Sequence, residues 1–153
     1  MNPRLTPFVR VLRPSRSVVV DTNVLVSAAL KEGSKPSRIL VQALRGNISP
    51  ITCPAIVWEY REVLARPKFR RWNFPPLWFE EFLRQAIHIP SDPPLSEYMD
   101  LPDRDDAVFL ALAVQQGACL VTGNIAHFPK AWRGSIDVVS AADYITWLES
   151  VGG

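Results

Sequence analysis

The stretch that decides the fold is "SVVVDTNVLVSA", residues 17–28. Val18, Val19 and Val20 are apolar and β-branched, and a short unbroken run of such residues is typical of a strand buried on both faces of a parallel sheet. Asp21 follows the run directly. Ligands bind beyond the carboxyl ends of the strands in an open parallel sheet, so this carboxylate is expected to face the binding crevice.

Short apolar segments alternate with helical patterns along the rest of the chain. Further strands are expected at 51–53, 87–89, 118–122 and 135–140, and helices at 22–30, 36–45, 54–66, 76–86, 103–117 and 141–150. This alternation predicts βαβ units and a parallel sheet with helices on both faces. Residues 68–76 and 90–102 are expected to be irregular connections, and residues 1–16 a flexible basic arm ahead of a domain at 17–150.

Composition excludes several classes of protein. The chain has 153 residues, of which 48% are hydrophobic, which suits one folded domain and argues against a disordered chain. The net charge of +2 permits a nucleic-acid partner but does not require one. No segment approaches the roughly 20 apolar residues of a membrane span, and the N-terminus lacks the apolar core of a signal peptide. We therefore expect a soluble, cytoplasmic protein.

The cysteines and histidines do not form a metal-binding pattern. Cys53 and Cys119 stand in apolar runs without a CxxC neighbour, so they are expected to be buried free thiols. His88 and His127 have no second histidine at ligand spacing. Both are therefore interpreted as surface or packing residues.

Oxygen-bearing side chains recur where the predicted strands end. They follow the first strand, lie on the helix after the second, and flank the fourth, so the fold is expected to gather them at one edge of the sheet. Several carboxylates at one place repel each other unless a cation lies between them, and Mg²⁺ or Mn²⁺ prefers oxygen ligands. The residues concerned are Asp21, Asn23, Glu59, Asp103, Asp106, Thr122 and Asn124.

Each of these residues has a purely structural alternative. The polar residues 21–23 could form only a helix N-cap, although three of them directly after a buried strand favour a site. Glu62 is expected to pair with Arg66 in solvent at i,i+4, whereas Glu59 is interpreted as functional.

For the acids before the fourth strand, the pattern distinguishes less clearly between a metal ligand and a structural residue. Asp103 and Asp105 are expected to cap the next helix or to lie in solvent. Asp106 stands one turn before an apolar face and is the preferred ligand of the three. Asn124 could serve only the tight turn after the strand.

Four segments, "VVVDTNVLVSA", "PAIVWEYREVLARPKF", "DRDDAVFLALA" and "LVTGNIAHFP", closely resemble the PIN-domain family. The likeness is to the branch whose members are classed as toxins of toxin–antitoxin pairs, and it extends over residues 17–145. It implies a three-layer α/β/α sandwich with a central parallel sheet of four or five strands. It also implies an endoribonuclease that depends on Mg²⁺ or Mn²⁺, the toxin of a type II pair.

The resemblance also implies a set of site residues. Asp21, Glu59 and Asp106 match the first three acids of the family and would hold the metal. The fourth catalytic position falls at Asn124, where many relatives have Asp. Asparagine is a neutral donor, so a one-metal site, a two-metal site completed by RNA phosphate and an inactive site all remain open.

Three further residues are expected to support this set. Asp103 could compensate for the missing acid, and Thr122 could orient a water or a phosphate. Asn23 completes the polar run after the first strand.

Positive charge for the substrate is expected in two places. Lys68, Arg70 and Arg71 stand next to Trp72, and basic residues mixed with aromatic ones suit single-stranded RNA. The arm offers further arginines. Alternatively, the aromatic segment 72–78 covers a partner, either a second copy in a homodimer or a cognate antitoxin.

Two rival functions remain. A phosphohydrolase acting on small phosphate esters also uses acids at strand ends, but the DxD pair of some such families is broken here by Asn23. A degenerate PIN domain would bind RNA or a protein without cleaving anything.

Overall fold

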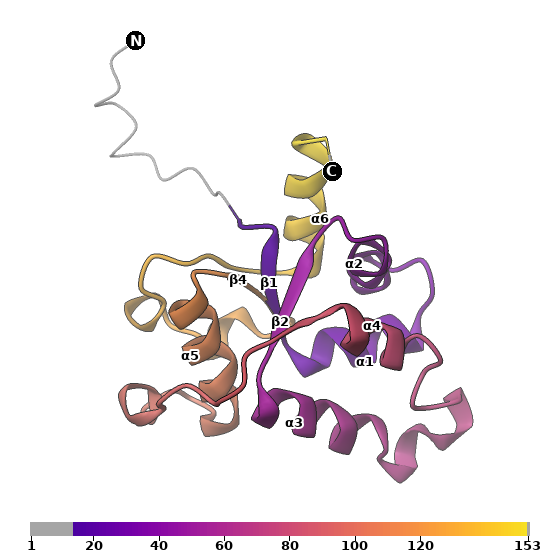
Figure 1. Ribbon diagram of the computed structural model, residues 1–153, viewed down its shortest axis with the longest axis horizontal. Helices are drawn as coiled ribbons and strands as arrows, with labels where there is room; N and C mark the ends of the chain where they lie inside the picture. The colour runs from indigo at the N-terminus through magenta and orange to yellow at the C-terminus, as the bar shows by residue number, and fades with distance from the viewer. Residues whose placement is uncertain (1–13, 153) are drawn as a thin grey trace.

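The computed structural model describes residues 14–152, and a parallel sheet of five strands lies at its centre (Figure 1). The strand order is β3-β2-β1-β4-β5, and every neighbouring pair is parallel. The strands are β1 (Ser17–Val20), β2 (Ser49–Thr52), β3 (Ile87–His88), β4 (Cys119–Val121) and β5 (Val138–Val139).

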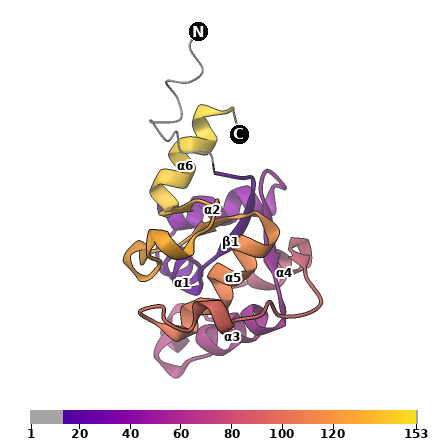
Figure 2. The same ribbon diagram turned by 90° about the vertical axis from the view of Figure 1, so that its left-hand side faces the viewer.

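Helices cover both faces of this sheet, which confirms the predicted three-layer α/β/α sandwich. In Figure 1, α5 lies on the other side of β1 from α2 and α4, and Figure 2 shows the same layers from the side. Helix α2 packs against α1, α4 and α6, whereas α5 packs on β1 and β4. The α-helices are α1 (Thr22–Leu30), α2 (Lys35–Leu44), α3 (Pro54–Leu64), α4 (Phe79–Gln85), α5 (Ala107–Gln116) and α6 (Ala141–Ser150).

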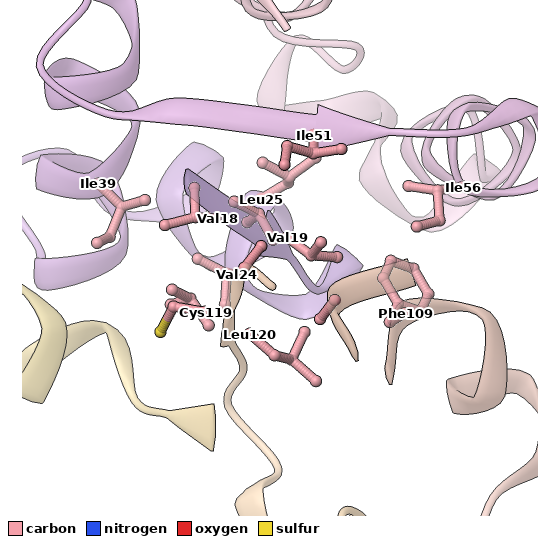
Figure 3. Packing of buried hydrophobic residues seen from close by; sticks show 14 of the residues in the cluster. Val18, Val19, Val24, Leu25, Ile39, Ile51, Ile56, Phe109, Cys119 and Leu120 are labelled. Carbon is pink, nitrogen blue, oxygen red and sulfur yellow. The ribbon is translucent and has the colours of Figure 1, made fainter. Parts of the chain in front are cut away.

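Strand β1 is buried on both faces, as its sequence predicts. Val18 and Val19 are fully buried. Figure 3 shows them in a cluster with Ile39 on one side and Ile56 and Phe109 on the other. Burying each such side chain contributes about 1.5–3 kcal/mol, so the central position of β1 follows from its composition.

Several predicted boundaries shift in the structure. The expected helix 103–117 is divided into a 3-10 turn, η4 (Arg104–Asp106), and α5. The side chain of Asp103 accepts a hydrogen bond from the Asp105 amide at 2.9 Å, and this local cap competes with α-helical pairing. Helix α5 ends at Gly117, whose φ of +63° is the left-handed conformation that glycine adopts readily.

Other segments differ in a similar way. The expected loop 68–76 begins with a 3-10 helix, η2 (Pro67–Trp72), and α4 starts only at Phe79. Strand β2 begins at Ser49, earlier than its apolar pattern predicted, because the Ser49 amide already donates to the carbonyl of Arg16 at 2.8 Å. Further 3-10 turns are η3 (Ser96–Tyr98), η5 (Ile125–His127) and η6 (Lys130–Trp132).

The end of the predicted N-terminal arm is in contact with the domain. The Tyr144 hydroxyl donates to the carbonyl of Ser15 at 2.8 Å, and the side chain of Arg16 donates to the carbonyl of Asn47. The remaining arginines of the arm, Arg4, Arg10 and Arg13, lie outside the described residues.

Two expectations about the whole chain can be compared with the structure. Cys53 and Cys119 are buried and free, as predicted. Within residues 14–152, no helix is long and apolar enough to cross a membrane.

Replacing Tyr60 with Phe should destabilise the fold by about 1–2 kcal/mol. The hydroxyl of Tyr60 is fully buried and donates to the carbonyl of Val20, so its loss removes a bond that joins α3 to the central strand. Urea unfolding followed by circular dichroism would measure the change. Tyr98→Phe, at a partly exposed ring, is the matched control, and equal stability of the two variants would contradict the expectation.

Candidate functional site

The strand order creates a crevice between the carboxyl ends of β1 and β4. The chain passes from β1 to β2 on one side and reaches β4 on the other, and such a reversal leaves the neighbouring strand ends uncovered. Asp21 lies here, with its amide donating to the Val121 carbonyl at 2.9 Å. Asp21 therefore stands at the switch point of the sheet.

Asp21 is held in place by donors from both strand ends. Its Oδ2 accepts from the Thr122 hydroxyl at 2.7 Å and from the Asn23 amide at 3.3 Å. Only 5% of the residue is exposed, and burial raises the pKa of its carboxyl. The bond from Thr122 opposes that rise, so the carboxylate is oriented by hydrogen bonds but poorly hydrated.

Asn23 and Asn124 shape the loop behind Asp21. The Oδ1 of Asn23 accepts from the Gly123 amide at 3.0 Å, and a Cβ at position 123 would lie 3.2 Å from that oxygen. The Asn124 amide donates to the Thr122 hydroxyl at 3.0 Å. Asn124, the predicted fourth catalytic position, is thus tied to the site through its backbone.

Glu59 reaches the same edge from α3. Its Oε2 accepts a hydrogen bond from the Thr22 hydroxyl, and the neighbouring Tyr60 fixes α3 against β1. Burial raises the pKa of Glu59, and the Thr22 bond partly offsets this. The charges of Asp21 and Asp106 raise it further, so the three predicted metal ligands repel one another.

Asp106 lies where η4 meets α5, and its side chain is 13% exposed. Burial raises the pKa of its carboxyl to about 6, with the charges of Asp21 and Asp103 adding to the effect. Its Oδ2 lies 3.0 Å from Nδ1 of His127. The inward position that the sequence predicted for this residue is therefore observed.

His127, which sequence reasoning assigned to the surface or to packing, is partly exposed and contacts Asp106, a contact that the sequence did not predict. It is on η5, in the loop that follows β4, and the only signal in the sequence was its place shortly after Thr122 at a strand end. The other histidine, His88, is exposed, which agrees with the expected surface position, and its ring hydrogen-bonds with the Thr52 hydroxyl at 2.6 Å and the Leu83 carbonyl at 2.7 Å.

The donor set fits a divalent cation. Within residues 14–152, the group of three ligand atoms that lie within 4.8 Å of one another comes from Asp103, Asp106 and His127. Asp21 and Glu59 are outside this group, deeper in the crevice and on its α3 side respectively. Asp103 caps η4, which was one of the alternatives that the sequence left open, and its carboxylate also lies near Asp106 and His127. A cation would relieve the mutual repulsion of these carboxylates.

The basic residues predicted to contact RNA lie away from the crevice, on η2 after the end of α3. The Arg71 guanidinium stacks 4.1 Å above the centre of the Trp72 ring, and the Lys68 ammonium lies 5.1 Å from the Phe69 ring centre. Lys68, Arg70 and Arg71 are exposed, so their charges are available to a ligand.

Fold and site together define a class: an α/β protein with a cluster of carboxylates at its switch point. The family model of the PIN domain matches residues 17–126. The chain therefore belongs to the PIN-domain family.

Two solved structures share this fold. PAE2754 from Pyrobaculum aerophilum superimposes with a TM-score of 0.58 at 16% identity, covering 88% of this chain and 90% of that one. VapBC2 from Rickettsia felis, solved bound to a DNA fragment from their promoter, gives a TM-score of 0.58 at 15% identity, covering 81% and 98%. A comparison with curated proteins gives no match.

Replacing Asp106 with Asn should stabilise the metal-free protein at pH 7. Because the pKa of this carboxyl rises from 3.8 to about 6 on folding, the folded state binds the proton more tightly, and stability falls as the pH rises through that interval. The amide avoids this loss, which is about 1–3 kcal/mol for a shift of this size. Urea unfolding in a chelator would show the gain at pH 7 and its disappearance near pH 4.

The exposed residue Asp100 provides the control, and Asp100→Asn should leave stability unchanged at both pH values. An Asp106→Asn protein no more stable than the parent at pH 7 would show that burial and repulsion do not act on this carboxyl as described.

Proposed function

We propose that the protein is an endoribonuclease that depends on Mg²⁺ or Mn²⁺ and is the toxin of a type II toxin–antitoxin pair. Membership of the PIN-domain family supports a nuclease. The observation that supports it most directly is that burial raises the pKa of Asp21, Glu59 and Asp106, and that the charge of Asp21 raises the pKa of the other two further. An arrangement that is unfavourable for the bare protein is typical of a functional site.

The residues have distinct roles in this proposal. Asp21, Glu59 and Asp106 hold the cation, and Thr22 and Thr122 orient two of these carboxylates through their hydroxyls. When bound, the cation supplies activation of water and stabilisation of the charge that develops on the phosphate. Asn124 contributes through the backbone bond that positions Thr122.

The basic surface on η2 is proposed to bind the RNA backbone. Phe69 stacks on Phe74 with ring centres 4.6 Å apart, and this pair supports the turn on which the exposed cations stand. Cations next to aromatic faces favour single strands, whose phosphates and unstacked bases are both accessible. Helix α3 joins this surface to Glu59.

A protein partner is proposed for a second surface, formed by α3 and α4. A groove of about 730 Å³ runs between α3, α4 and the end of β3, and its rim includes Trp58, which is 66% exposed. Leu77, before α4, is fully exposed. Apolar surface of this kind suits an interface. The name VapBC2 describes a two-component protein, which supports a cognate antitoxin here, and a second copy of the chain is the other candidate.

Asp21→Asn should abolish metal-dependent RNA cleavage, with a loss of about 100-fold or more. The amide lacks the charge that attracts the cation but keeps the size of the buried side chain and one oxygen that can accept from Thr122 and Asn23. Cleavage of an RNA oligonucleotide in Mn²⁺ measures the effect, and an unchanged circular dichroism spectrum shows that the fold is retained.

Glu62→Gln is the control for that variant, because Glu62 is an exposed acid of α3 that pairs with Arg66 and is not one of the proposed ligands. Full activity in the Asp21 variant would refute the assignment. Turnover of p-nitrophenyl phosphate without RNA cleavage would favour a small-molecule phosphohydrolase instead.

The neutral Asn124 favours a second candidate function, a PIN domain that binds RNA or protein without cleaving. Isothermal titration with Mn²⁺ separates the two. Retained RNA affinity with neither cation binding nor cleavage would select the binding protein.

Replacing Lys68, Arg70 and Arg71 together with Ala should weaken RNA binding and leave the metal affinity unchanged. Each lost phosphate contact should reduce the slope of log affinity against log salt by about 0.7. Fluorescence anisotropy with a labelled oligonucleotide at several salt concentrations measures both quantities. Arg45→Ala, on the exposed end of α2, is the control, and an equal effect from it would contradict a specific surface on η2.

A further inference from the structure

The loop after β4 contains a possible nitrogen ligand at the place where the family's fourth acid is missing. Asn124 and His127 share the turn η5, since the His127 amide donates to the Asn124 carbonyl at 2.9 Å. The imidazole is 39% exposed and meets Asp106 with Nδ1 3.0 Å from Oδ2. The turn therefore supplies an imidazole three residues beyond a neutral amide.

Asp103 lies close enough to Asp106 and His127 to form a group of three potential metal ligands with them. One ligand atom each from Asp103, Asp106 and His127 lies within 4.8 Å of the other two. Ligands of a single ion at about 2.0–2.3 Å from it are separated by no more than about 4.6 Å, so small side-chain adjustments suffice for all three to bind one cation. Asp21 and Glu59 are outside this set, which leaves Asp106 as the residue shared with the deeper carboxylates.

The chemistry of the three donors distinguishes among cations. Mg²⁺ prefers oxygen ligands and keeps much of its water, whereas an imidazole suits first-row transition ions. Two carboxylates also supply the charge that Asn124 does not. An ion pair between Asp106 and His127, together with the cap that Asp103 forms on η4, is the alternative explanation of this grouping, and it predicts no nitrogen-bound Mn²⁺.

We infer that Asp103, Asp106 and His127 form a second cation position at the outer rim, in which the imidazole replaces the absent acid and favours Mn²⁺ over Mg²⁺. The inference deepens the proposed nuclease site, because it names the residues and the ion preference of its outer position. Asp106 bridges the inner and outer positions, and Asp103 and His127 belong to the outer one.

Pulsed electron paramagnetic resonance of the full chain with Mn²⁺, in the absence of RNA, tests the inference. The parent protein should show the nitrogen coupling of a directly bound imidazole, and His127→Gln should lose it. In the same variant one Mn²⁺ per chain should bind about tenfold or more weakly, while the affinity for Mg²⁺ should change less than about twofold. Asp103→Asn should weaken Mn²⁺ binding and keep the nitrogen coupling.

His88→Gln is the matched control, because His88 is the other histidine of the chain and its ring contacts Thr52 and Leu83 instead of the acids. It should keep both the coupling and the affinity. No nitrogen coupling in the parent protein, or equal Mn²⁺ affinity in His127→Gln, would overturn the inference and leave His127 as an ion-pair partner of Asp106.

The same samples separate this inference from the proposed function. A parent protein that binds Mn²⁺ through His127 but cleaves no RNA would support the outer site and refute the nuclease. A protein that cleaves RNA without nitrogen coupling would refute the outer site alone.

Discussion

The site depends on the pairing of β1 with β4. These strands are distant in the chain but adjacent in the sheet, and their parallel register brings the Thr122 hydroxyl to 2.7 Å from the carboxylate of Asp21. The pairing also removes Asp21 from water, because α1 and the loop after β4 close around it. A buried carboxylate is unfavourable unless hydrogen bonds or a cation stabilise it. The sheet therefore determines where this carboxylate lies, and by burying it also makes its charge unfavourable unless hydrogen bonds or a cation stabilise it.

The surrounding carboxylates make the charge of Asp21 more unfavourable still, because they repel it. Glu59 and Asp106 reach the crevice from helices on different sides of it, and each has a raised pKa because burial and neighbouring charges act together. Rigid elements hold them there: Tyr60 fixes α3 to the central strand, and α5 packs on β1 and β4. The packing of the core therefore keeps the backbones that carry these carboxylates at the same edge of the sheet. A divalent ion relieves their repulsion without any change of fold.

The sequence agrees closely with the structure where a feature, such as a buried strand or the end of a helix, depends only on residues within one short segment. The valines of β1 and the glycine after α5 act through neighbouring residues, so their effects can be read from a short window. The errors occur where local bonds compete, as at Asp103, whose side chain replaces the first α-helical turn with η4. Three of the proposed ligands could be named beforehand, because Asp21 follows a strand, Glu59 lies on the helix after β2, and Asp106 stands at the start of the helix before β4.

The sequence by itself determined the alternation of buried strands and helices, and with it a carboxylate at the mouth of a parallel sheet. Only the tertiary structure decided that β1 lies between β2 and β4, and that His127 meets Asp106 from the loop after β4. The physical reason is the distance along the chain over which each interaction acts. Apolar patterning and caps act within a few residues, whereas a contact between two loops depends on the strand order and the packing of every element between them.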